Sequence, residues 1–222
     1  DYHIVKDTAL QCVLRLRAGG CPLEHQSEII GLINEDKNEP FKIINSGKIT
    51  KRYVRNTNVT GAYQQHNKTC FAFAACSAYI NTIMRIYGSR PPPTFQECYE
   101  IAAYNGNNGG RTEEAIRRLE EHFQYGILHR TTNKTTILKT MTISVILIFT
   151  TSKIGWHKIS RGKLMETPCG KNEGYHAVLI EGYDLEKDCL ICKNSWAKTG
   201  KDRFDLRIQA LKEYYFVEVY FT

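Results

Sequence analysis

Residues 69–88, TCFAFAACSAYINTIMRIYG, set the centre of the fold. Apolar side chains occupy nearly every face of a helix drawn through residues 70–87, which is typical of a helix buried on all sides within a domain. Thr69 suits the N-cap position, and Gly88 ends the apolar run. We therefore expect a central buried helix whose first residue is Cys70.

The segments after this helix indicate an α+β fold. Thr94 and Glu97 form a capping-box pattern that opens a second helix over residues 95–104. A Gly/Asn loop over residues 105–110 separates it from a third helix, which opens at Thr112 and ends by Gly126. Beyond residue 136 the pattern changes, and we expect strands at residues 143–149, 176–183, 189–194, 204–208 and 215–221. Helices followed by strands predict two lobes with a cleft between them.

Composition favours one ordinary globular domain and excludes two classes of function. The 222 residues are 42% hydrophobic and 24% charged. The best apolar run, residues 141–149, is shorter than the roughly 18 residues that a membrane-spanning helix needs. The net charge of +7 is spread along the chain, and its densest cluster, residues 51–55, is too small for a nucleic-acid footprint. We expect neither a membrane nor a nucleic acid as partner.

Cys70, His176 and Asn194 suit nucleophilic catalysis. A cysteine attacks as a thiolate, and the positive end of a helix dipole at its N-terminus favours that anion. An imidazole such as His176 lowers the thiol pKa further, and an amide such as Asn194 can hold the ring in place. Taken alone, Cys70 also suits a buried structural cysteine, the common fate of Cys in an Ala-rich helix.

Five short stretches together resemble the papain-like cysteine proteases. They are Gln64, Cys70-Phe71-Ala72-Phe73, Asn108-Gly109-Gly110, His176-Ala177-Val178 and Asn194-Ser195-Trp196. The resemblance implies that Cys70 is the nucleophile and His176 its base, with the ring held by Asn194. It also implies that the Gln64 side chain helps to stabilise the oxyanion, for which Gln65 is a rival candidate.

The same resemblance implies the substrate-binding residues and the architecture. Gly109 and Gly110 would pair with the backbone of an extended substrate, and Trp196 would shield the His–Asn hydrogen bond from water. Arg111, Thr112 and Tyr175 would line the pocket for the second residue before the cut. The expected fold is papain-like and two-lobed, with a helical left lobe and an antiparallel β-barrel-like right lobe.

Three functions fit these residues. The leading one is a cysteine endopeptidase that cleaves polypeptides through an acyl-enzyme. The second is a catalytically silent papain-like binding module, suggested by the trimmed domain. The third is a peptidase specific for ubiquitin-like tails, suggested by the start of the chain.

Cysteine positions bear on the compartment and on metal binding. The family's half-cystine positions three before the nucleophile and just before Asn-Gly-Gly are Asn67 and Asn107 here. Their joint absence favours a reducing, cytoplasmic location over a lysosomal or secreted one. Cys189 and Cys192 form a C-x-x-C, but residues three apart in a strand point to opposite faces. We expect no metal and no cofactor.

Residues 1–20 resemble the C-terminal tail of ubiquitin, ending in a basic, leucine-containing run and Gly19-Gly20, with Ala18 inserted. This predicts a ubiquitin–protease fusion, with ubiquitin or deubiquitinases as candidate partners through residues 14–20. The expected division is a ubiquitin-like tail over residues 1–20, a linker or residual pro-segment over residues 21–57, and a papain-like domain over residues 58–222.

Overall fold

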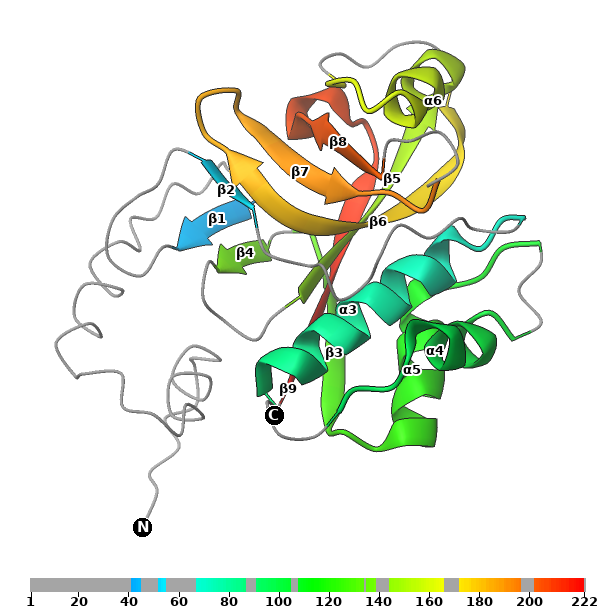
Figure 1. The fold of residues 1–222 in the computed structure, drawn as a ribbon. Helices are drawn as coiled ribbons and strands as arrows, with labels where there is room; N and C mark the ends of the chain where they lie inside the picture. Colours follow the sequence, from blue (N-terminus) through cyan, green and yellow to red (C-terminus); the bar gives the residue numbers. More distant parts are fainter. Residues whose placement is uncertain are drawn as a thin grey trace, which may run out of the picture.

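The computed structural model describes residues 41–44, 52–54, 67–86, 91–104, 108–133, 135–138, 144–165, 172–196 and 202–221. Helix α3 (Cys70–Ile86) crosses the middle of the molecule, with α4 (Phe95–Ala102) and α5 (Thr112–Phe123) on one side and the sheet on the other (Figure 1). Every residue of α3 from Phe71 to Ile83 is buried. The prediction of a central helix that begins at Cys70 is confirmed.

Local hydrogen bonds explain where the helices begin and end. The Thr69 carbonyl accepts from the backbone N–H of Phe73 at 3.1 Å, which starts the first turn of α3. At α4 the capping box forms as expected: the Thr94 N–H donates to Glu97 Oε2 at 2.7 Å, and the Glu97 N–H donates to Thr94 Oγ1 at 3.3 Å. Helix α4 ends at Ala102 rather than at residue 104, and α5 ends where Gln124 turns left-handed, with φ of 55°.

The main sheet is antiparallel and open. Its order is β3 (Ile127–Thr132), β9 (Tyr214–Phe221), β5 (Ser144–Ser152), β6 (Asn172–Asp184), β7 (Cys189–Lys193) and β8 (Arg203–Leu206), with β2 (Arg52–Val54) pairing beside β6. In the described part of the chain β3 and β8 stand at opposite ends of this order. The expected antiparallel lobe is confirmed, but its sheet does not close into a barrel.

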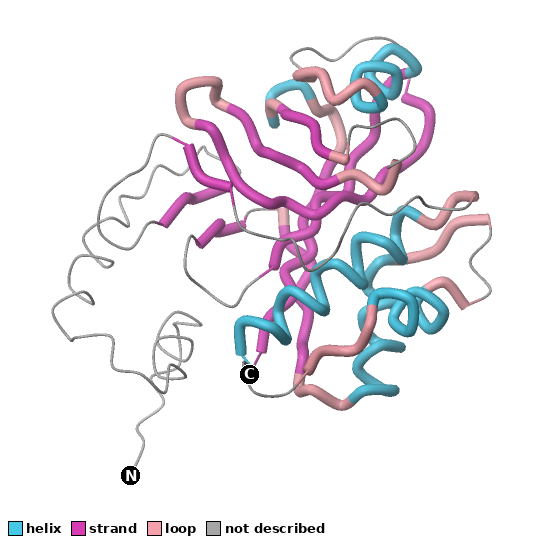
Figure 2. Tube along the Cα trace, viewed as in Figure 1, coloured by secondary structure: helices cyan, strands magenta, loops and turns pink. Residues whose placement is uncertain are grey.

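Both faces of the central strands are buried, because alternate residues serve different cores. Along β5, Ile146 and Ile148 pack with α3, whereas Val145, Leu147 and Phe149 enter a second core on the opposite face. Figure 2 shows the helices α3, α4 and α5 gathered on one side of the strands. The strands that carry the middle of the sheet are therefore held rigidly against α3.

Several elements were not predicted from the sequence. They are β1 (Phe41–Ile44), which pairs in parallel with β4 (Thr135–Leu138), together with β2, β3, the 3-10 helix η3 (Ile208–Ala210) and α6 (Lys153–Ser160). Helix α6 begins where the Ser152 hydroxyl accepts from the Gly155 N–H at 3.3 Å. The predicted strands all occur, with ends that differ from the predicted ones by at most four residues.

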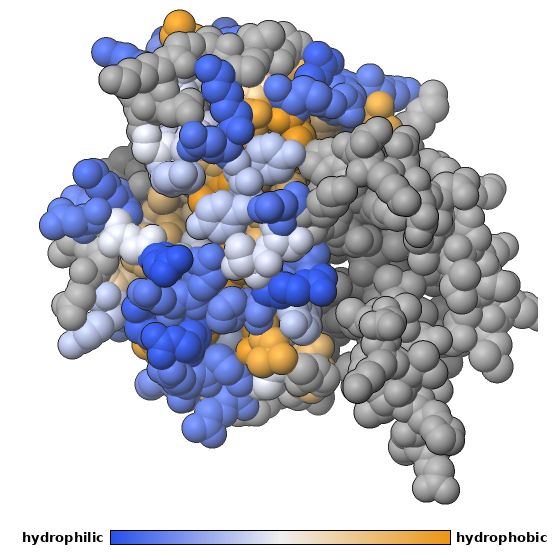
Figure 3. Space-filling view, turned by 180° about the vertical axis from the view of Figure 1, so that it is seen from behind, coloured by the Kyte–Doolittle hydropathy of each residue, from blue (hydrophilic) through white to orange (hydrophobic). Residues whose placement is uncertain are grey.

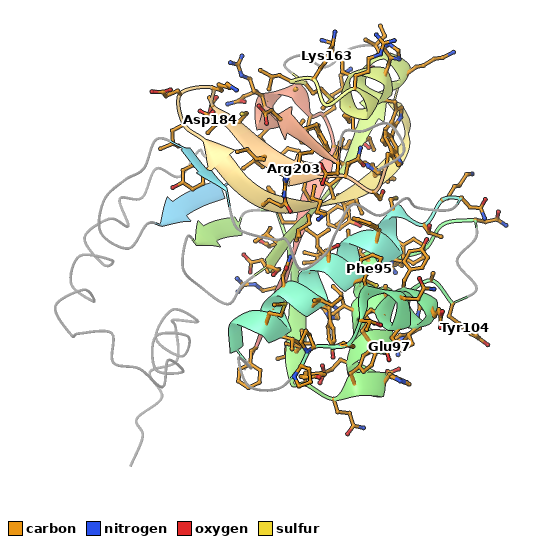
Figure 4. All side chains as sticks on the ribbon, in the orientation of Figure 1. Phe95, Glu97, Tyr104, Lys163, Asp184 and Arg203 are labelled. Carbon is orange, nitrogen blue, oxygen red and sulfur yellow. The ribbon has the colours of Figure 1, made fainter. Side chains whose placement is uncertain are left out.

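Among the described residues, no helix has both the length and the apolar character needed to span a membrane. The face turned away in Figure 1 carries hydrophilic residues over much of its described area, with apolar ones in small groups (Figure 3). Figure 4 shows Tyr104, just beyond α4, projecting outward, and it is 68% exposed. Scattered exposed aromatic residues of this kind are ordinary for folded proteins.

Candidate active site

A cavity of about 660 Å³ lies where the N-terminus of α3 meets β5 and β6. Its lining combines residues from both lobes: Cys70 and Phe71 come from α3, Ile148 from β5, and His176 and Ala177 from β6. The predicted cleft between the helical and sheet lobes is therefore present. The complete lining is Asn67, Lys68, Cys70, Phe71, Asn108, Gly109, Gly110, Arg111, Thr112, Ile148, Trp156, Gly174, Tyr175, His176, Ala177, Trp196 and Tyr215.

Cys70 is the half-buried first residue of α3. Burial by itself raises the pKa of its thiol. The hydrogen bond and the charge of His176 oppose this effect, together with backbone hydrogen bonds from Ala177 and Phe71. These interactions outweigh burial, so the pKa of Cys70 is lowered overall. A lowered thiol pKa raises the fraction of thiolate, which is the nucleophilic form.

His176 is held by Asn194, which directly follows β7. Its Nε2 lies 2.9 Å from Asn194 Oδ1. The backbone N–H of Ser195 donates to the same atom at 2.9 Å, which identifies that atom as the amide oxygen, because a backbone N–H cannot accept. The oxygen therefore accepts from Nε2–H, and Nδ1 is left as the ring nitrogen that can exchange a proton with the thiol.

Aromatic rings enclose the buried His176 side chain. Trp196 stacks on it with ring centroids 4.9 Å apart, and Trp156 meets it edge-on at 5.1 Å. Phe149 makes a third contact at 5.9 Å. Trp196 was expected from the sequence, whereas Trp156 was missed. Trp156 lies on α6, and its short segment has no motif; the only available signal was that the chain contains just two tryptophans.

The loop before α5 forms another wall of the cavity. Gly109 has φ of 108°, a conformation that favours glycine. A Cβ added at Gly110 would lie 2.5 Å from Phe71 Cζ, so any other residue would require that ring to shift. Arg111 directly precedes α5 and is exposed. Tyr175, also exposed, donates its hydroxyl hydrogen to Glu213 Oε2 at 3.3 Å.

The cavity thus includes every predicted site residue except two. Asn194 does not line the cavity, but it is hydrogen-bonded to His176, which does. Gln64 lies outside the described residues, as do Gln65 and residues 1–40. Lys68, Ile148 and Tyr215 also line the cavity, although no sequence motif pointed to them.

The C-x-x-C cysteines lie away from the cavity in β7. Both are buried, and burial raises the pKa of Cys189 to about 12 and that of Cys192 well above its ordinary value. Across the part of the chain that the structure describes, no group of His, Cys, Asp and Glu side chains is arranged to hold a metal.

A comparison with models of protein families places the chain. The model of the papain family cysteine proteases matches residues 94–212, which is more than half of the sequence. This chain belongs to the papain family. It is accordingly a papain-like cysteine peptidase, and the family implies polypeptide substrates. The matched segment contains His176 and Asn194, whereas Cys70 lies before it.

One solved structure supports the papain-like fold, and a second is similar at a lower TM-score. The proform of Amb a 11, a cysteine protease and pollen allergen of ragweed, has 16% identity and a TM-score of 0.51, covering 79% of this chain and 66% of its own. Xylellain, a cysteine protease from Xylella fastidiosa, has 15% identity and a TM-score of 0.45, with coverage of 82% and 96%. A comparison with curated proteins found no match.

Proposed function

We propose that this papain-family protein is an endopeptidase with Cys70 as nucleophile, His176 as base and acid, and Asn194 as the residue that orients the ring. The observation that carries the proposal is the arrangement around the cavity. The Cys70 thiol is hydrogen-bonded to His176, and Asn194 Oδ1 lies 2.9 Å from Nε2 on the far side of the imidazole ring. This is the nucleophile–base–orienter arrangement of covalent catalysis.

The proposed reaction has two halves. The Cys70 thiolate attacks the scissile carbonyl carbon, and the protonated His176 gives its Nδ1 proton to the leaving amine. A water molecule then loses a proton to His176 and attacks the resulting thioester, which releases the carboxylate product and restores the thiol. We assign the Gln64 side chain to the oxyanion, where losing one such donor typically costs on the order of 3 kcal/mol in the barrier.

Labelling tests this function. We expect a thiol-reactive peptidyl epoxide to modify Cys70 under reducing conditions, as located by mass spectrometry, and an internally quenched peptide to be cut within its length. Cys70→Ala should abolish both results. Asn194→Ala should leave Cys70 labelled more slowly and should lower kcat more than KM, because ring orientation matters most in the transition state. A folded protein whose Cys70 stays unmodified would instead support the silent binding module.

Two finer proposals concern the rest of the chain. We assign residues 1–20 to a ubiquitin-like tail and residues 21–57 to a linker or residual pro-segment. Residues 52–54 of this segment form β2, which pairs with β6 of the peptidase sheet. Hydrolysis of ubiquitin–fluorophore, but of no simple peptide, would support specificity for ubiquitin-like tails.

We also propose a cytoplasmic location, based on the joint replacement of two family half-cystines by Asn67 and Asn107. Expression of the full chain with a compartment marker would test it. Recovery from lysosomes or from the medium would contradict it.

A further inference from the structure

The charge of the cavity is one-sided. Two of its lining residues, Lys68 and Arg111, have basic side chains, and none of the described lining residues is Asp or Glu. Lys68 lies two residues before Cys70, whereas Arg111 directly follows Gly110. The cavity that contains the nucleophile therefore has two cations in its lining, from separate segments of the chain.

Neither cation is neutralised within the described structure. Both side chains are exposed, and neither forms an ion pair with a described carboxylate. Two glutamates have partners of their own: Glu113 Oε1 accepts from the Thr131 hydroxyl at 3.1 Å, and Glu213 accepts at 3.3 Å from the hydroxyl of Tyr175, which lines the cavity. Neither glutamate lines the cavity. Lys68 and Arg111 therefore remain available to a ligand.

The wall beside Arg111 also offers apolar contact. Ile148 and Ala177 are buried and line the cavity, and Tyr215 is half-buried beside them. Burial raises the pKa of the Tyr215 hydroxyl; the charge of Glu113 raises it further and that of Arg111 lowers it, so both charges act on this side chain. A side chain with an apolar stem and a terminal negative charge would place its methylene groups against this wall and its carboxylate toward the guanidinium.

We propose that the cleft selects polypeptides that carry Asp or Glu just before the scissile bond. Arg111, which the family resemblance assigns to the pocket for the second residue before the cut, would recognise the acidic side chain, and Lys68 would reinforce the preference. The inference rests on the proposed function, because it needs Cys70 to be the point of attack. It specifies the substrate class for that site: acidic segments of unfolded or extended chain.

The preference should be moderate because both cations are exposed. An ion pair with an exposed cation gives up to about a fivefold gain in binding, and two such contacts acting on one peptide multiply. Salt screens exposed charges, since the Debye length falls from about 10 Å at 0.1 M to about 3 Å at 1 M. The selectivity should therefore shrink as the salt concentration rises.

Matched peptides test the inference. Internally quenched substrates differing only by Glu against Gln at the second residue before the cut have nearly the same shape and differ in charge. We expect kcat/KM to be about fivefold higher for the Glu peptide at low salt. Arg111→Gln should bring this ratio close to one, and Arg111→Glu should favour a Lys peptide. The control is Arg117→Gln on α5, which removes the same charge outside the cavity and should keep the ratio.

The possible outcomes distinguish a failure of the endopeptidase function from a failure of the acidic preference. If Cys70 is not labelled and no peptide is cut, the proposed endopeptidase function fails. If peptides are cut but Glu and Gln substrates react equally, or if Arg117→Gln lowers the ratio as much as Arg111→Gln, the acidic preference is wrong while the peptidase stands. A ratio that does not change between about 0.1 M and 1 M salt would also overturn it.

Discussion

Glu181 lies at the centre of a buried charge cluster that should govern stability. It is in β6 and fully buried, and it accepts a hydrogen bond from Arg203 Nε. Its other oxygen lies 3.9 Å from Nζ of Lys193, which is only 2% exposed. Figure 4 shows Arg203 on the sheet lobe. Glu181→Gln keeps the shape of the side chain and removes its charge, which leaves Lys193 as a buried cation without this carboxylate.

The loss of unfolding free energy in Glu181→Gln depends on how exposed the two cations are. Arg203 is 42% exposed and can recover hydration, whereas Lys193 cannot. Breaking a buried pair by neutralising one partner typically costs about 3–5 kcal/mol. For a domain of this size each kcal/mol lowers the Tm by about 2–4 °C, so a loss of about 4 kcal/mol corresponds to about 8–16 °C.

The assay is urea unfolding followed by circular dichroism, with two comparison variants. Glu218→Gln is the matched control: Glu218 is also buried and bonded to an arginine, but that partner, Arg130, is 59% exposed. Glu218→Gln should lower the free energy of unfolding less than Glu181→Gln does. Adding Lys193→Met to Glu181→Gln should restore most of the stability, because no buried charge then remains at position 193.

The pH dependence has a defined sign. Burial lowers the pKa of Lys193, although the charge of Glu181 raises it in part. Without Glu181 the native-state pKa falls further below the unfolded value of about 10.4, so the unfolded state binds more protons between those two values. The free energy of unfolding therefore rises with pH in that window. The deficit of Glu181→Gln relative to the parent should therefore shrink as the pH rises through this window.

Three results would refute this reasoning. They are a loss below about 1 kcal/mol for Glu181→Gln, a loss no larger than that of Glu218→Gln, and a deficit that does not change with pH. Any of them would mean that solvent reaches Lys193 or that another group neutralises it.

Two further predictions concern the cleft. Gly110→Ala should destabilise the protein by about 1–3 kcal/mol in urea unfolding and lower kcat/KM, because its Cβ would lie 2.5 Å from the ring of the buried Phe71; unchanged stability would show that this ring moves aside freely. His176→Ala should slow iodoacetamide labelling of Cys70 near neutral pH, because burial then raises the thiol pKa without the opposing interactions of the imidazole. Each unit of increase lowers the thiolate fraction about tenfold, and superimposable pH–rate profiles would contradict the assignment.

The sequence predicted best those elements whose pattern is local and strong. Helix α3 is apolar on nearly all faces, so its burial followed from composition alone. The capping box of α4 needed only two residues three positions apart. Helix α6 and strands β1 to β4 were missed because they are short and weakly patterned, so tertiary pairing decides their conformation.

For the candidate site, sequence motifs named the residues but not their surroundings. Trp156 was not predicted to lie at the site because its position depends on how α6 packs against β5. No local sequence pattern indicates that packing. The sequence also did not predict that the sheet is open. Closure into a barrel depends on whether the outermost strands, β3 and β8, pair, and these strands lie far apart in the chain.

By itself, the sequence determined the α+β class, the central helix that begins at Cys70, and the residues that match the papain family. Only the tertiary structure decided that His176 turns Nε2 toward Asn194, that the Cys70 pKa is lowered despite burial, and that the Lys193 charge is buried beside Glu181. The physical reason is the separation along the chain over which each interaction acts. Helix propensity and capping act over a few residues, whereas these interactions join side chains from different elements and depend on burial that only the folded chain creates.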